Sequence, residues 1–169
     1  KATPTAEDFT FSSPDSLTYD GQQHAVELVE STGSPSAAAP SLKLPAKLDT
    51  SAITLKYYQE DGTTPAVESD ATTAPKDVGT YTVKIDVADG DIYATADGLG
   101  GGWTFTIKPA TLTVESITAE NKTYDGTDTA AVSGVTFSGL VTPEGQPETL
   151  ELGTDFTVSE AAFEDATVG

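Results

Sequence analysis

Residues 80–87 read Thr-Tyr-Thr-Val-Lys-Ile-Asp-Val, and this segment decides the fold class. Polar residues stand at every second position, and four apolar residues alternate with them: Tyr81, Val83, Ile85 and Val87. Successive side chains of a β-strand point to opposite faces of its sheet, so a period of two gives one apolar and one polar face. The segment therefore predicts a β-strand that packs one face on a core and exposes the other to water.

The same alternation recurs elsewhere in the chain. It is clear in residues 103–108 and 111–115, and weaker through 26–28, 53–57 and 156–158. Asp-Gly pairs, which are typical of tight turns, separate several of these segments. No stretch has the 3.6-residue apolar period of a helix, and Ser31–Asp49, rich in Ser, Ala and Pro, is interpreted as a long loop with one helical turn near Lys47. The pattern favours an all-β, antiparallel sandwich.

The charge excludes several classes of partner. The chain has 27 acidic and 8 basic residues, a formal net charge of −19, and no cysteine. Such a charge repels phosphate backbones and anionic lipid, so we expect no nucleic-acid partner and no membrane insertion in this fragment. The lack of cysteine excludes disulfides, zinc–thiolate sites and thiol nucleophiles.

A short repeat divides the chain. Thr18-Tyr19-Asp20-Gly21 returns as Thr123-Tyr124-Asp125-Gly126, at an offset of 105 residues, and each copy lies between β-like segments. A proline, which cannot donate a ladder hydrogen bond, follows the strand pattern that ends at residues 107–108. We therefore predict two tandem modules, residues 1–108 and 109–169.

These motifs resemble two known families. Leu17–Gln22, Lys56–Tyr58, Asp77–Val83 and Trp103–Lys108 together resemble the MBG-type bacterial Ig-like repeat. Lys122–Thr127 and Ala162–Gly169 resemble the related YDG-type repeat. The resemblance implies two tandem Ig-like antiparallel β-sandwich modules of the kind found in large secreted or wall-attached bacterial surface proteins and adhesins.

The second module is expected to be incomplete in this sequence. In the first module Val78-Gly79 leads into the strand of residues 80–87, and 28 residues separate Gly79 from Ile107. The equivalent Val168-Gly169 ends the sequence. A sandwich without its closing strands exposes an edge and part of its core. We therefore predict that this module is loosely ordered or paired with a neighbouring molecule.

One acidic segment is a candidate calcium site. Its carboxylates are Asp86, Asp89, Asp91 and Asp97. Calcium takes six or more oxygen ligands, which such a segment could supply in part, but the spaced pattern of an EF-hand loop is missing. The alternative is an exposed acidic turn. No other cofactor is expected.

Catalytic constellations are weak. His24 is the single histidine, so a Ser-His-Asp triad would have to include it, and no Gly-x-Ser-x-Gly elbow occurs. We interpret His24 as a solvent-facing residue at a strand end. With 27 acidic residues, some carboxylate pair always has the spacing of a glycosidase, so such a pair has no specificity. The sequence therefore predicts a protein that is not an enzyme.

Aromatic residues and glycines allow two further interpretations. Tyr57 and Tyr58 are adjacent and point to opposite faces of a strand, so one of them, taken as Tyr58, is a candidate for stacking on a sugar ring. Trp103 heads an alternating strand and is expected in the core. The glycines of residues 98–102 precede no Gly-Lys-Ser/Thr motif, so we interpret them as a wide hairpin or bulged loop rather than a phosphate site.

The preferred function is a structural stalk. We expect a non-catalytic repeat region of a bacterial cell-surface or secreted adhesin-like protein, with neighbouring Ig-like repeats as its partners. The alternative is a module that binds a host glycan or protein through Ser31–Asp49 and Tyr58, because loops on a rigid sandwich commonly carry binding sites.

Overall fold

The computed structural model describes residues 1–15, 17–141 and 149–164. The chain forms two compact units, Lys1–Pro109 (unit 1) and Ala110–Gly169 (unit 2), each described by itself below. Apart from two single-turn 3₁₀ helices, η1 (Ala6–Asp8) and η2 (Thr50–Ala52), all described regular structure is β. The prediction of an all-β chain is confirmed.

Residues 80–87 belong to the central strand of a three-stranded sheet in unit 1. Strand β5 (Gly79–Val87) lies between β4 (Ile53–Gln59) and β6 (Ala96–Ile107), antiparallel to both. Its four alternating apolar side chains are buried, as predicted. Thr82 departs from the pattern: it is also buried, and its hydroxyl donates to the Glu60 carbonyl (3.4 Å), because the turn after β4 covers the polar face there.

The pairing of β5 with β6 slips at the glycines. Val83 pairs with Trp103, but the next residue of β5, Lys84, pairs with Gly100. The two intervening glycines have no partner on β5, so they form a β-bulge. This confirms the interpretation of the glycine run as a bulged segment.

The second sheet of unit 1 contains two departures from the predictions. Its order is β1 (Thr10–Ser12), β3 (Ser41–Lys43), β2 (Glu27–Val29), with β3 antiparallel to β1 and parallel to β2. The expectation of a loop throughout Ser31–Asp49 is therefore wrong, because Leu42 and Leu44 are buried and bring this segment into the sheet. The fold is also not wholly antiparallel. Lys47 lies in a turn with φ 67°, not in a helical turn.

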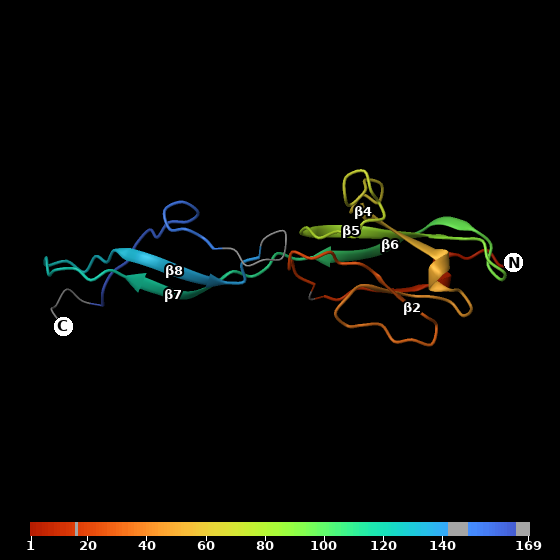
Figure 1. The fold of residues 1–169 in the computed structure, drawn as a ribbon, viewed down its shortest axis with the longest axis horizontal. Coiled ribbons are helices and arrows are strands. Elements are labelled where there is room, and N and C mark those ends of the chain that lie inside the picture. Colours follow the sequence, from red (N-terminus) through yellow and green to blue (C-terminus); the bar gives the residue numbers. More distant parts are fainter. Residues whose placement is uncertain (16, 142–148, 165–169) are drawn as a thin grey trace. The chain divides into compact units, whose positions relative to one another are not determined.

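One apolar core joins the two sheets of unit 1. The sheets lie on opposite sides of it (Figure 1), and a hydrogen bond from the Val26 N–H to the buried Tyr57 hydroxyl (3.0 Å) links them. Burial raises the pKa of this hydroxyl. Trp103 is half-buried beside the core, where its ring stacks on Phe11 and meets the edge of Phe9. The buried residues of the core are Phe9, Leu17, Val26, Leu42, Leu44, Leu48, Tyr57, Ala74, Tyr81, Val83, Ile85, Val87, Phe105 and Ile107.

Backbone pairing between distant segments closes unit 1. Thr18 and Lys108 form a parallel bridge, in which the Tyr19 N–H donates to the Lys108 carbonyl (2.8 Å) and the Lys108 N–H donates to the Leu17 carbonyl (2.9 Å). A second parallel bridge joins Ala2 to Tyr93. The beginning of unit 1 is therefore tied to its last strands.

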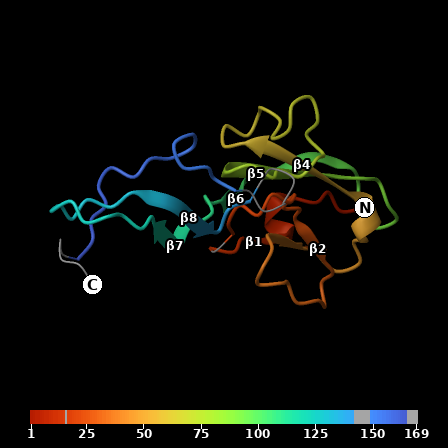
Figure 2. The same cartoon turned by 60° about the vertical axis from the view of Figure 1, so that its left-hand side comes forward.

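Unit 2 has fewer strands in the part that the structure describes. Strands β7 (Thr113–Ala119) and β8 (Val132–Ser138) form an antiparallel pair, visible side by side in Figure 2. The region predicted as a strand at residues 156–158 forms only an isolated bridge between Leu152 and Phe156, whose ring packs edge-on against Phe137 (5.0 Å between centroids). The residues 167–169 that echo Asp77-Val78-Gly79 lie outside the described part.

The bulge gives a test of the fold. Gly100 has φ 114°, and a Cβ there would lie 2.7 Å from the Val83 carbonyl oxygen and 2.8 Å from the Trp103 ring. Gly100→Ala is expected to lower the free energy of unfolding by about 1–3 kcal/mol. Both the positive φ, which strains a residue with a side chain, and the close contacts of the new Cβ destabilise the folded state.

The matched control is Gly102→Ala. A Cβ there meets nothing within 4 Å, so the change should stay within about 0.5 kcal/mol. Urea denaturation followed by the fluorescence of Trp103 measures both variants, and equal effects would contradict the assignment of strain to Gly100.

Candidate functional site

The repeated Tyr-Asp-Gly motif forms the same turn in both units. The Asp20 carboxylate accepts the Gln22 N–H (2.8 Å), and the Asp125 carboxylate accepts the Thr127 N–H (2.9 Å). The glycine after each aspartate has positive φ, 75° at Gly21 and 80° at Gly126. Aspartate that caps its own turn, followed by a residue without a Cβ, explains the motif physically. The motif is therefore a structural signal in both units.

Two further aspartates of unit 1 stabilise turns in the same way. Asp61 accepts hydrogen bonds from the backbone of Thr63 and from the backbone and hydroxyl of Thr64, which hold the pKa of its carboxyl well below the usual range. Asp70 accepts from the hydroxyls of Thr73 and Thr72 and from the Thr72 N–H, which lower its pKa to about 2. These carboxylates are engaged by the loops that carry them.

The four carboxylates of the calcium hypothesis are distributed over three segments. Asp86 lies on β5 and Asp97 on β6, while Asp89 and Asp91 lie in the connection between these strands. Asp86 is paired with Lys56 and accepts the Gly98 N–H (2.8 Å), and Asp89 is paired with Lys1 (2.5 Å). Partial burial raises the pKa of Asp86, but the Lys56 and Gly98 hydrogen bonds outweigh it and the pKa is lowered.

Metal-ligating residues do not gather in the described chain. Within residues 1–15, 17–141 and 149–164, no three His, Cys, Asp or Glu side chains lie close enough to hold a metal ion. The acidic segment is thus arranged chiefly around two lysines, and calcium binding stays a hypothesis.

Tyr58, the candidate sugar-stacking residue, is half-buried on β4. The Lys84 ammonium lies 5.0 Å from the centroid of its ring and also donates to the Gly62 carbonyl (2.7 Å). One face of the ring is therefore engaged in a cation–π contact with Lys84 of β5.

His24 is mostly buried, so its interpretation as a solvent-facing residue is wrong. Its side chain is 12% exposed, and its backbone N–H donates to the Pro75 carbonyl (2.9 Å). Its Nε2 lies 3.1 Å from an Asp20 oxygen but in a poor direction for a hydrogen bond. That carboxylate oxygen already accepts the turn N–H of Gln22.

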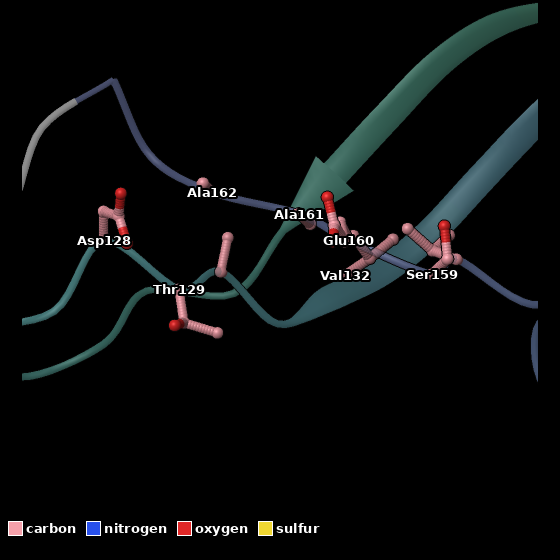
Figure 3. Close-up of a pocket in the computed structure, with 9 residues that line it drawn as sticks. Asp128, Thr129, Val132, Ser159, Glu160, Ala161 and Ala162 are labelled. Carbon is pink, nitrogen blue, oxygen red and sulfur yellow. The ribbon is translucent and has the colours of Figure 1, made fainter.

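Unit 2 contains a groove that no sequence pattern indicated. Its volume is about 680 Å³, and it lies where residues 160–162 run beside residues 128–130 (Figure 3). Thr129 and Ala162 form a bridge there, and the Phe163 N–H donates to the Asp128 carbonyl (2.7 Å). Val132 and Val158 supply its largest apolar side chains. No local motif marks this groove, because its two walls are about thirty residues apart in the sequence.

Comparisons with known proteins support half of the proposed resemblance. Residues 108–169 match the YDG domain family, which confirms the YDG part. No curated protein and no solved structure matches the chain. In the described residues, no helix has the length and apolar character needed to cross a membrane.

Acid should weaken the turn at Asp70. The pKa of Asp70 is about 2 in the folded protein and 3.8 in an ordinary aspartate. The carboxylate therefore contributes stability above about pH 4, and this contribution is lost as the pH falls towards 2. Asp70→Asn should lower the urea midpoint at pH 6, and the difference from the parent chain should narrow between pH 4 and pH 2. A difference independent of pH would contradict the assignment.

Calcium should leave the melting temperature unchanged. Because Asp86 and Asp89 are engaged by lysines, the melting temperatures in millimolar calcium and in chelator should agree to within about 1 °C. Millimolar calcium bound at a site of micromolar affinity would instead stabilise the folded state by about 4 kcal/mol. A melting temperature that rises when calcium is added would instead support the calcium site, provided that Asp86→Asn abolishes the rise and the control Asp8→Asn retains it.

Proposed function

We propose that the chain is a non-catalytic stalk region of a bacterial cell-surface or secreted protein. In this proposal unit 1 is an Ig-like module of the MBG type, and unit 2 belongs to a neighbouring Ig-like repeat. The YDG match and the shared Tyr-Asp-Gly turn support a tandem arrangement. The acidic surface keeps such a stalk soluble and self-repelling.

The observation that carries the proposal is the parallel closure of unit 1. When a stalk is pulled, tension enters unit 1 at its two ends. Residues 17–19 and Lys108 run parallel, so tension moves them in opposite directions along their length. Backbone hydrogen bonds run between the strands, so those at Tyr19 and Lys108 share the force and must break together.

The N-terminal segment has the same geometry. The Ala2 N–H donates to the Ile92 carbonyl (2.9 Å), the Ala94 N–H donates to the Ala2 carbonyl (2.8 Å), and the Ala2–Tyr93 bridge is parallel. Lys1 adds an ion pair to Asp89. Pulling on residue 1 therefore meets a second pairing that resists sliding, as a module that transmits force requires.

The alternative, a glycan- or host-protein-binding module, has less support. Within Ser31–Asp49, β3 lies in the centre of its sheet and Leu42 and Leu44 lie in the core. One face of the Tyr58 ring is engaged by Lys84. Both elements proposed to bind a ligand, Ser31–Asp49 and Tyr58, therefore make contacts that hold the fold of unit 1 together.

Mechanical unfolding tests the stalk. Lys108→Pro removes the N–H that donates to the Leu17 carbonyl, as well as the Nζ that donates to the Asp15 carbonyl (2.5 Å). In single-molecule pulling the unfolding force of unit 1 should be roughly half that of Lys108→Ala, since one of two closing backbone hydrogen bonds is lost. The event is recognised by its length increment of roughly 35 nm, from about 3.4 Å for each residue of Lys1–Pro109.

Lys108→Ala is the control, because both variants lose the side-chain hydrogen bond to the Asp15 carbonyl but only the alanine keeps the backbone N–H. Equal forces for the two variants would reject the closure as the resisting element. Specific binding on a glycan array that Tyr58→Ala removes would favour the binding module instead.

A further inference from the structure

The sheet of unit 2 has an apolar face that is covered on one strand only. Cross-strand partners lie on the same face, so Val114 with Phe137 and Ile117 with Val135 form one apolar surface. On β8 these side chains are half-buried, and Phe156 packs on Phe137. On β7 the exposed fractions are 52% for Val114 and 62% for Ile117.

The groove continues this surface. Ala119 pairs with Val132 at the end of the same face. Val132 lines the groove (Figure 3), and Val158 is a second lining residue. The apolar surface therefore runs along β7 and β8 and then into a hollow. Isolated exposed apolar residues need no explanation, but a continuous surface of this kind indicates a contact site.

Among the described residues of unit 2, the outer edge of β7 is also open. No described residue of unit 2 pairs with the edge of β7 that faces away from β8. Unit 1 covers the comparable edge of β4, where the loop that follows exchanges backbone hydrogen bonds with Tyr57 and Gln59. An open edge beside exposed apolar side chains is the geometry that accepts an added strand.

Charge decides which strand fits. The described residues of unit 2 hold eight carboxylates and one lysine, Lys122, which is paired with Asp125. Glu115 lies within β7, Glu120 follows it, and Asp128 and Glu160 line the groove. A second copy would bring the same carboxylates together on its own β7, so repulsion disfavours it.

We propose that β7 accepts, by strand addition, an extended cationic segment of another polypeptide with apolar residues at alternate positions. Its backbone pairs with the open edge of β7, and its apolar side chains extend the surface of Val114 and Ile117. Its positive charge is attracted to the carboxylates in and beside the strand, Glu115 and Glu120. This interaction site is independent of the mechanical role proposed for unit 1.

Three synthetic peptides test the proposal on the complete 169-residue chain. The first, Lys-Val-Lys-Ile-Lys-Val-Lys, has the proposed charge and alternation. The second, Lys-Lys-Val-Ile-Val-Lys-Lys, has the same composition without alternation, and the third, Glu-Val-Glu-Ile-Glu-Val-Glu, reverses the charge. By fluorescence anisotropy at 50 mM salt the first peptide should bind at least about tenfold more tightly than either control, and 0.5 M salt should weaken it.

Variants and hydrogen exchange locate the peptide. Ile117→Thr should reduce its affinity about fivefold or more, whereas Ile92→Thr, at an isoleucine of unit 1 that is 42% exposed, should leave it unchanged. The peptide should slow exchange of amides in Thr113–Ala119. Both isoleucines are exposed, so melting curves should show both variants folded.

Four results would overturn the proposal. Equal affinities of the two cationic peptides would show that charge attraction alone explains binding, without strand addition. An acidic peptide that binds as tightly as the first would show that charge does not select the partner. Amides of β7 that are already protected in the free monomer would show that the chain covers this edge itself. A concentration-dependent dimer in sedimentation, with β7 protected, would make a second copy the occupant.

Discussion

Unit 1 depends on the burial of one face of β5. Val83 and Ile85 have no accessible surface, and burying a side chain of this size contributes about 1.5–3 kcal/mol. The strand pairs along both edges, so it positions β4 and β6, and its apolar face packs in the core shared with the other sheet. The bulge at Gly101 and Gly102, the turn that covers Thr82 and the half-buried Trp103 are all adjustments around this strand.

Local patterns in the sequence predicted the strands that have enough length to alternate. Residues 80–87 and 103–107 show their period directly, and both form the strands expected of them. Strand β3 was missed because three residues, Ser41 to Lys43, are too few for a period, and its burial comes from β1 and β2, which are distant in sequence. A parallel partner is likewise set by long-range packing, which no local pattern encodes.

For the candidate sites too, local features could be predicted from the sequence and long-range contacts could not. The Asp-Gly signals predicted turns correctly because an aspartate that accepts the N–H two residues later acts within the turn itself. The roles of Asp86 and Tyr58 depended on Lys56 and Lys84, which reach them across the sheet, and sequence proximity suggested a cluster of carboxylates instead. The backbone of His24 pairs with Pro75, fifty-one residues away, and no local pattern indicates this contact.

The parallel closure of unit 1 also constrains the order of folding. Residues 17–19 are synthesised about ninety residues before their partner Lys108. Contacts of such separation form slowly, because the chain between them must be ordered first. Unit 1 therefore cannot close until its last strand has been made. A chain that crosses a membrane in the unfolded state during export would keep that state until the whole module is available on the far side.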